Sequence, residues 1–264
     1  MTAKRSLRLL LRGIHAGILT ATALFMLAPS VVVVLLSFSN DSFMRLPPTS
    51  WGFRQYVTLF SSGEWLEPFV RSLTLAAWTA VVTVPLGLAA VLGLYRTSAP
   101  GRSLVQFLGL APLLVPGIAY AVALYSLLAR ARLLGRFEGL VAVHITLALP
   151  YVLLIVGAAI TRVPRELEMA ALSLGASRPR AWLDITLRLL LPAIVAAGIF
   201  AFIGSFDETI ITSFLAGSGF VTLPVAIFNN VRYGVDPVIT AIATLLTAGT
   251  ALLLALNAVL RRTR

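Results

Sequence analysis

The chain has 264 residues, of which 59% are hydrophobic and 12% are charged, and its mean hydropathy is +0.95. This composition excludes a soluble core enclosed by a charged surface and is typical of an integral membrane protein. The net charge of +11 does not indicate nucleic-acid binding, because the basic residues cluster between apolar runs instead of forming a basic surface interleaved with aromatic side chains.

Six apolar stretches are long enough to cross a hydrocarbon core, which takes about 20 helical residues. Because backbone groups in lipid must be hydrogen-bonded within the chain, these stretches have to be helices. We therefore expect an all-α, polytopic fold with a single transmembrane domain over residues 1–264. The predicted spans cover residues 13–38, 72–95, 103–128, 139–161, 189–216 and 237–260, and kinks are predicted at Pro29, Pro85, Pro112, Pro116 and Pro150.

The segment between the first two spans, residues 39–71, is the largest expected on the outer side. It is rich in aromatic residues such as Trp51, Tyr56 and Trp65, which suit the membrane interface. Two interpretations stay open: a docking surface for an external partner, or an interfacial turn with a short amphipathic helix.

The basic residues indicate the orientation of the chain, because short cytoplasmic segments carry an excess of Lys and Arg. Placing the N-terminus inside assigns most of them to the cytoplasm, and an even number of spans keeps both basic termini on that side. The cluster Arg130, Arg132 and Arg136 would then lie outside, against the rule, but the two termini outweigh it.

The cytoplasmic segment 162–188 carries the strongest local signals. Glu166 and Glu168 suit the first turn of a short helix, where carboxylates complement the helix dipole. Gly175 is placed to end that helix in a left-handed conformation, and Ser177 can cap a second helix that runs toward the fifth span. The pattern predicts a rigid helix–elbow–helix, whereas the plainer alternative is an ordinary connecting loop.

This segment resembles the EAA loop of ABC importer permeases, whose pattern is Glu-Ala-Ala, three residues, Gly, a spaced aromatic residue and a Val/Ile-x-Leu-Pro ending. The residues that fall in register are Ala170, Ala171, Gly175, Ala176, Ser177, Trp182, Ile185, Leu187 and the later Pro192. The chain departs from the pattern at Met169, which stands where the motif has Glu while Glu168 comes one residue earlier, and at Arg188, which replaces the proline.

The resemblance implies the type I permease fold of ABC importers, with a coupling helix that inserts into a cytoplasmic ATPase subunit. The residues to which it gives this ATPase-coupling role are Glu168, Ala170, Ala171, Gly175, Ala176, Ser177 and Trp182. Small alanines around the elbow would let the partner's surface approach closely.

The chain itself lacks the residues for nucleotide binding or catalysis. A P-loop needs a lysine after its glycines, and the only lysine is Lys4. The absence of cysteine excludes thiolate chemistry, and His15 and His144 are too few for a metal site. We therefore expect no enzyme activity and no cofactor or metal on this chain, with ATP and Mg bound by partner subunits.

Two carboxylates, Asp207 and Glu208, stand within the predicted fifth span. Intramembrane carboxylates are costly and usually face a bundle interior or an aqueous pathway. The alternative is a packing role, for instance by pairing with Arg71. His144, in the fourth span, is interpreted as a hydrogen-bonded packing residue in preference to a proton relay.

The run Ser205-Phe-Asp-Glu208 and the segments beginning at Thr222 and Asp236 resemble the shorter permease subunit of the spermidine/putrescine importer family. This likeness implies a bacterial inner-membrane protein that forms half of a path for a cationic polyamine, lined by Ser205, Asp207 and Glu208. The implied partners are a second permease subunit, two ATP-binding subunits and an extracytoplasmic solute-binding protein. The alternatives are an ABC permease for another small solute, and a stand-alone secondary transporter or ion channel with the two carboxylates as ion ligands.

Overall fold

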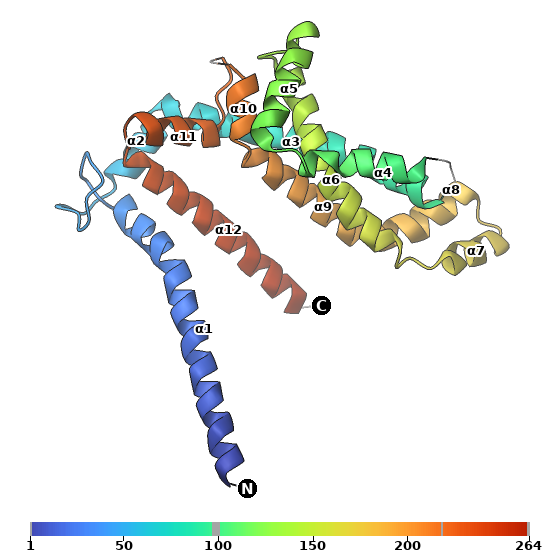
Figure 1. Cartoon of the computed structure of the whole chain (residues 1–264), viewed down its shortest axis with the longest axis horizontal. Coiled ribbons are helices and arrows are strands. Elements are labelled where there is room, and N and C mark those ends of the chain that lie inside the picture. Colours follow the sequence, from blue (N-terminus) through green and yellow to red (C-terminus); the bar gives the residue numbers. More distant parts are fainter. Residues whose placement is uncertain (1, 97–100, 218, 263–264) are drawn as a thin grey trace. The chain divides into compact units, whose positions relative to one another are not determined.

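A computed structural model of the chain describes residues 2–96, 101–217 and 219–262. Within these ranges the regular secondary structure is helical (Figure 1). The β-type pairing in them is an isolated bridge between Ser39 and Trp51. The helices are α1 (Thr2–Ser37), α2 (Arg54–Ser61), α3 (Gly63–Arg96), α4 (Arg102–Leu110), η1 (Ala111–Leu113), α5 (Gly117–Arg130), α6 (Phe137–Ile160), α7 (Arg165–Ser173), α8 (Arg178–Ala181), η2 (Trp182–Leu187), α9 (Arg188–Phe206), α10 (Ile210–Leu215), α11 (Leu223–Tyr233) and α12 (Val238–Arg262). The predicted all-α fold is confirmed.

The described residues divide into two compact units. One contains the residues up to Leu66 together with those from Asn229 onward, and the other is Glu67–Phe228. In the first unit, α12 packs against both α1 and α2. The functional residues predicted from the sequence all lie in the second unit.

The loop before α2 in the first unit is ordered by hydrogen bonds to its own backbone. The Gln55 side chain donates to the carbonyl oxygens of Ser39 and Asp41, each at 3.0 Å. The side-chain and backbone hydrogen bonds from Thr49 hold the pKa of the Asp41 carboxyl below its usual value. Trp51 remains 58% exposed, as an aromatic residue at a membrane interface or a docking surface would be.

Helix α6 is central to the second unit because it contributes to both apolar clusters of that unit. One cluster joins Val152 and Val156 of α6 to α3 and α9, and the other joins Leu140 and Val143 of α6 to α3, α5 and α10. Figure 1 shows α6 alongside α9 for much of its length.

Glycines let neighbouring helices approach α6 closely. A Cβ atom on Gly87 of α3 would lie 2.5 Å from Cγ1 of Val152, and one on Gly109 of α4 would lie 2.5 Å from Cδ1 of Leu153. Because Val152 is fully buried, it has no room to move away. Small residues at such contacts are typical of helix packing in membranes, where close van der Waals contact replaces the hydrophobic driving force.

In the part of the chain that the structure describes, four helices are long and apolar enough to cross a membrane: Arg12–Ser37, Gly63–Tyr95, Phe137–Ile160 and Arg178–Phe206. Arg102–Leu113 and Gly117–Arg130 meet at 108° and together are long and apolar enough to form a fifth, broken span. The kinks predicted at Pro112 and Pro116 within the span 103–128 fall at this bend, where Pro116 stands in non-helical backbone directly before α5. The described apolar part of α12, Val238–Leu252, is shorter, so the count of six spans stays a prediction.

The predicted span 189–216 is also interrupted. Helix α9 ends at Phe206, a short bend follows, and α10 begins at Ile210. The two carboxylates, predicted to stand inside a continuous helix, lie in the bend instead. The physical reason is that a carboxylate close to the start of α10 can accept hydrogen bonds from backbone N–H groups that have no helical partner.

The contact between α3 and α6 makes Gly87 a test of this packing. We expect Gly87→Ala to lower the free energy of unfolding by about 1–3 kcal/mol, because its methyl group would overlap the buried Val152. Gly93→Ala on the same helix is the matched control, because a Cβ there meets no other atom within 4 Å. Thermal unfolding of the purified protein in lipid or detergent measures both, and equal stability of the two variants would contradict this packing.

Candidate functional site: the elbow after α7 and the break after α9

The segment that resembles an EAA loop forms the predicted helix–elbow–helix. Helix α7 begins with Glu166 and Glu168 in its first turn and ends at a left-handed glycine, Gly175, with φ of +89°. The N–H of Gly175 bonds to the carbonyl of Leu172 at 3.0 Å, and that of Ala176 bonds to the carbonyl of Ala171 at 3.0 Å. This pair of bonds is the Schellman ending of a helix, so the predicted role of Gly175 as the elbow is confirmed.

The second arm of the elbow runs without interruption into the membrane-crossing helix. Ser177 precedes α8 in extended backbone, as predicted for a cap, but its side chain makes no capping hydrogen bond, so that detail was wrong. Pro179 in the first turn, with its fixed φ, stabilises the start instead. Helix α8 continues through the π-helix η2, which begins at Trp182, and then into α9.

The outer surface of the elbow is apolar and accessible. Ala170 is exposed, whereas Ala171, Ala176 and Trp182 are half-buried. Leu174, directly before the glycine, is 89% exposed. A large apolar side chain held out by a rigid turn is a typical anchor for a partner protein. Leu174 is not part of the motif, so the sequence pattern did not single it out.

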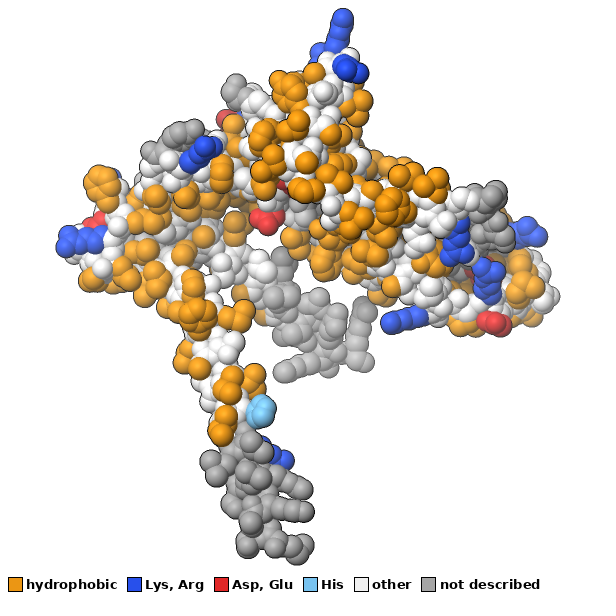
Figure 2. Space-filling view, viewed as in Figure 1, with side chains coloured by type: hydrophobic (Ala, Val, Ile, Leu, Met, Phe, Trp, Pro, Cys, Tyr) orange, Lys and Arg blue, Asp and Glu red, His pale blue; other side chains and the backbone are white. Residues whose placement is uncertain are grey.

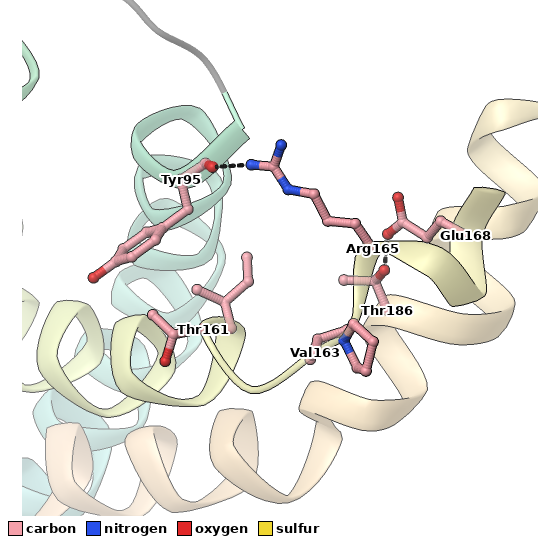
Figure 3. A pocket seen from close by; sticks show the side chains of 8 residues that line it. Tyr95, Thr161, Val163, Arg165, Glu168 and Thr186 are labelled. Atoms are coloured by element: carbon pink, nitrogen blue, oxygen red, sulfur yellow. Dashed lines mark hydrogen bonds between the residues drawn. The ribbon is translucent and has the colours of Figure 1, made fainter.

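The base of the elbow surrounds a cavity of about 190 Å³. Figure 3 shows the Arg165 guanidinium reaching the carbonyl oxygen at the end of α3 and the Glu168 carboxylate reaching the hydroxyl of Thr186 in η2. The first of these hydrogen bonds, from Arg165 Nη2 to the Tyr95 oxygen, is 2.8 Å long. The residues lining the cavity are Tyr95, Ile160, Thr161, Val163, Pro164, Arg165, Glu168 and Thr186.

These two hydrogen bonds fasten α7 to the end of α3, which lies far away in the sequence, and to the nearby η2. Arg165 joins the first arm to α3, and Glu168 joins it to the second arm through Thr186, which is fully buried. A push on α7 would therefore be transmitted to α3 and α9 together. In Figure 2, basic side chains gather at the end of the unit that carries α7 and α8.

The break after α9 holds the two carboxylates in different ways. The carboxylate of Glu208 accepts hydrogen bonds from the N–H groups of Ile211 at 2.9 Å and Thr212 at 2.7 Å, so it caps α10. Asp207 is exposed and is not part of that cap. Asp207 is therefore the more accessible of the two carboxylates.

Arg71 binds neither of these carboxylates. It forms an ion pair with Glu67, one turn earlier on α3, and its guanidinium carbon lies 5.5 Å from the centre of the Phe220 ring. The pairing of Arg71 with Asp207 or Glu208, considered from the sequence as a packing alternative, is therefore not formed.

Ser205, the third predicted pathway residue, is buried and faces His144 of α6. Its hydroxyl oxygen lies 2.7 Å from His144 Nδ1, and Nε2 of the same ring lies 3.0 Å from the Thr212 hydroxyl oxygen. Thr79 of α3 joins this cluster through Ser205 at 3.2 Å. His144 is thus hydrogen-bonded between helices, as interpreted from the sequence, whereas Thr79 and Thr212 were not singled out.

Residues 83–264 match the family described as the inner membrane component of binding-protein-dependent transport systems. The chain belongs to this family. It is 32% identical over 229 residues to the putrescine transport system permease protein PotI of Escherichia coli K12, covering 84% of this chain and 81% of that protein. It is 30% identical over 240 residues to the spermidine/putrescine transport system permease protein PotC of the same strain, covering 90% and 88%.

The fold of this permease also agrees with a solved structure. A crystal structure of a bacterial alginate ABC transporter, in complex with a periplasmic protein bound to an alginate pentasaccharide, contains a chain that superposes with a TM-score of 0.69. The alignment covers 94% of this chain and 92% of the other, at 19% identity. The chain is therefore a membrane permease with the type I importer fold, and its family acts in transport at the inner membrane.

The tie between Glu168 and Thr186 can be tested directly. We expect Thr186→Val to lower the free energy of unfolding by about 1–3 kcal/mol. Valine has nearly the same volume as threonine, but it removes the hydroxyl that donates to the half-buried Glu168 carboxylate. Thr186→Ser should restore stability. Thr161→Val is the matched control, since the Thr161 hydroxyl lies at the same cavity but bonds to a carbonyl of its own helix at 2.9 Å. Thermal unfolding that is equal for the two valine variants would contradict the tie.

Proposed function

We propose that this chain is one of two permease subunits of an ATP-driven importer and that its elbow couples it to a cytoplasmic ATPase. The observation that carries this proposal is the rigid left-handed turn at Gly175, which holds Leu174 out of the bundle in a chain of this transport family. The elbow would insert into a groove of the ATPase, with Ala170, Ala171 and Ala176 allowing close approach and Trp182 bracing the second arm.

The energy for transport would come from partner subunits. The only lysine is Lys4, so the chain has no P-loop, and we infer that ATP and Mg bind to two separate ATPase subunits while this chain binds no cofactor. Closure of those subunits would push α7. The hydrogen bonds of Arg165 and Glu168 would carry this movement to α3 and α9, switching the path between inward and outward access.

The orientation follows from the same arrangement. If the elbow faces the cytoplasm, the exposed arginines Arg162, Arg165, Arg178 and Arg180 lie on the side that the positive-inside rule prefers. Both termini would then be cytoplasmic. The loop before α2, with its exposed Trp51, would face outward, where an extracytoplasmic solute-binding protein could dock.

The second permease subunit would cover much of the apolar surface of this one. In the most apolar windows of α9 and α6, 22% and 44% of the residues are buried within the chain. Hydrophobic side chains cover much of the surface around α5 and α6 in Figure 2. Lipid and a second subunit of similar fold would share this surface, with the solute path between the two subunits.

We infer that the solute is a cationic polyamine, such as putrescine or spermidine. The names of the relatives PotI and PotC support this substrate class. The exposed carboxylate of Asp207, at a break in a membrane-crossing helix, supports it independently, because a carboxylate on the path stabilises a passing ammonium group. Ser205 and Glu208 would lie behind Asp207 at the path. Their hydrogen bonds to His144 and to the Ile211 N–H would stabilise the conformation of the break.

The coupling role of the elbow predicts the behaviour of Gly175→Val. The left-handed backbone is strained for a branched residue by about 1–2 kcal/mol, and no clash contributes because a Cβ there meets no atom within 4 Å. In the reconstituted transporter, we expect solute uptake to be lost while ATP hydrolysis no longer responds to the loaded binding protein.

The matched control for this experiment is Gly217→Val, which also places a branched residue in left-handed backbone, at φ of +63° and in open space, but beyond α10, past the end of α9 that is remote from the elbow. Unchanged uptake and an unchanged ATPase response in Gly175→Val would show that the elbow is not the coupling element. An equal loss in the control would point to general instability instead.

The role of Asp207 predicts weaker uptake of polyamines by Asp207→Asn. Removing one charge-assisted contact, worth about 1.5–3 kcal/mol, should lower the apparent affinity of the path at least about tenfold. Glu138→Gln removes an exposed carboxylate elsewhere in the same unit and is the charge-matched control. Labelled putrescine uptake in cells that lack their own polyamine importers measures both, and equal uptake would exclude Asp207 from the path.

A further inference from the structure

A buried chain of hydrogen bonds crosses the second unit at the break between α9 and α10. At its centre, His144 is 1% exposed and contacts Ser205 through Nδ1 at 2.7 Å and Thr212 through Nε2 at 3.0 Å. Thr212 is fully buried and Ser205 is 6% exposed. These three side chains come from α6, α9 and α10, so the ring of His144 bridges both sides of the break.

The series of hydrogen bonds around His144 continues to further groups on both sides. On one side, Ser205 Oγ lies 3.2 Å from Thr79 Oγ1, and the Thr79 hydroxyl donates to the Leu75 carbonyl at 2.8 Å. On the other side, Thr212 Oγ1 lies 2.8 Å from Glu208 Oε2. Five contacts in a row therefore connect the Leu75 carbonyl to the Glu208 carboxyl group.

The number of protons available does not match these contacts. Each hydrogen bond uses one proton, and each hydroxyl or neutral imidazole supplies one. Three hydroxyls and a neutral His144 supply four protons for the five contacts when Glu208 is ionised. One contact would then place two lone pairs face to face in a buried space, which costs about 1–3 kcal/mol.

One additional proton satisfies every contact. If it resides on Glu208, the carboxyl group donates to Thr212, Thr212 donates to Nε2 of His144, and Nδ1–H donates to Ser205. If it resides on His144, the imidazolium donates to Ser205 and to Thr212, and Thr212 donates to the carboxylate of Glu208. Both forms contain the same protons and carry no net charge, which suits a site of low dielectric constant.

The other charged groups around the cluster do not replace this proton. Within the described residues, Glu208 forms no ion pair, and Arg71 on α3 is engaged by Glu67. Asp207 is exposed and makes no side-chain contact with the cluster. The backbone N–H groups of Ile211 and Thr212 donate to Glu208 but do not reach His144.

We propose that this cluster is a proton-binding site, which holds one proton shared between His144 and Glu208 when the break has this conformation. Loss of the proton removes one of the five hydrogen bonds and leaves a half-buried negative charge on Glu208 beside the break. The attachment of α10 to α6 then weakens, and with it the positioning of Asp207. Only this last step rests on the proposed function.

The first experiment measures the proton and does not depend on transport. The chain contains only two histidines, so His15→Gln leaves His144 as the single imidazole. In the full-length chain in liposomes, ¹⁵N NMR of labelled histidine reports whether His144 is an imidazolium. Infrared difference spectra between this protein and its Glu208→Gln variant report a protonated carboxyl group.

We expect one of these two signals near neutral pH, and either one supports the site. A neutral His144 together with no carboxyl signal that depends on Glu208 would overturn the proposal. Thr212→Val, which disconnects His144 from Glu208, should abolish the signal. Because the wild-type cluster is tested by spectroscopy first, poor folding of that variant does not remove the test.

The second experiment measures the pH profile of uptake in the assembled transporter. Wild-type uptake should fall as the pH rises and the cluster loses its proton. Glu208→Gln should lose this fall, because the amide does not titrate and the cluster then has no carboxyl group with which His144 can share a proton. Glu138→Gln is the control and should follow the wild type.

Identical pH profiles of the wild type and Glu208→Gln would overturn the role of the site in transport. Absence of polyamine uptake by the wild type, with the spectroscopic signal present, would instead refute the proposed substrate and leave the proton site standing. The two proposals therefore fail in distinguishable ways.

Discussion

Every backbone N–H and C=O group in the apolar helices needs a partner within the chain, because hydrocarbon offers none. The break after Phe206 is where this constraint shapes the site. It leaves the first N–H groups of α10 without helical partners, and the carboxylate of Glu208 accepts hydrogen bonds from two of them. Once Glu208 is fixed in this way, Thr212 and His144 are fixed through it, and Asp207 is left as the accessible carboxylate.

The elbow after α7 satisfies the same constraint by a different device. There the unpaired groups are carbonyls at the end of a helix, and the left-handed backbone of Gly175 brings two N–H groups back to them. The turn is short because it needs no side chain, and this leaves Leu174 free to point outward. Arg165 and Glu168 then anchor the short helix to the ends of α3 and η2. A polar cap thus serves the membrane break, and a glycine cap serves the protruding turn.

Local features of the sequence predicted the parts of the fold that depend on local forces. The length of the apolar runs predicted α3 and α6, and the position of Gly175 predicted the elbow. Both predictions succeed because helix length and helix capping depend on neighbouring residues. The sequence did not predict that Glu208 would interrupt its helix, since a capping carboxylate and a pathway carboxylate look alike. Nor did it reveal the contacts of His144, whose partners lie 61 and 68 positions away. Thr79 and Thr212 carried a weak signal as hydroxyls in apolar runs, but only packing shows which of them meet.

The sparse internal burial of the helices has a thermodynamic consequence. With 44% of the most apolar part of α6 buried within the chain, and less in the other long helices, much of the apolar contact area belongs to lipid or to other subunits. Mass action then links stability to assembly, since a partner that binds only the folded chain stabilises it in proportion to the logarithm of its concentration. A substitution on the outer surface of α5 or α9 would accordingly alter the abundance of complete complexes in the membrane before it altered the fold of the single chain.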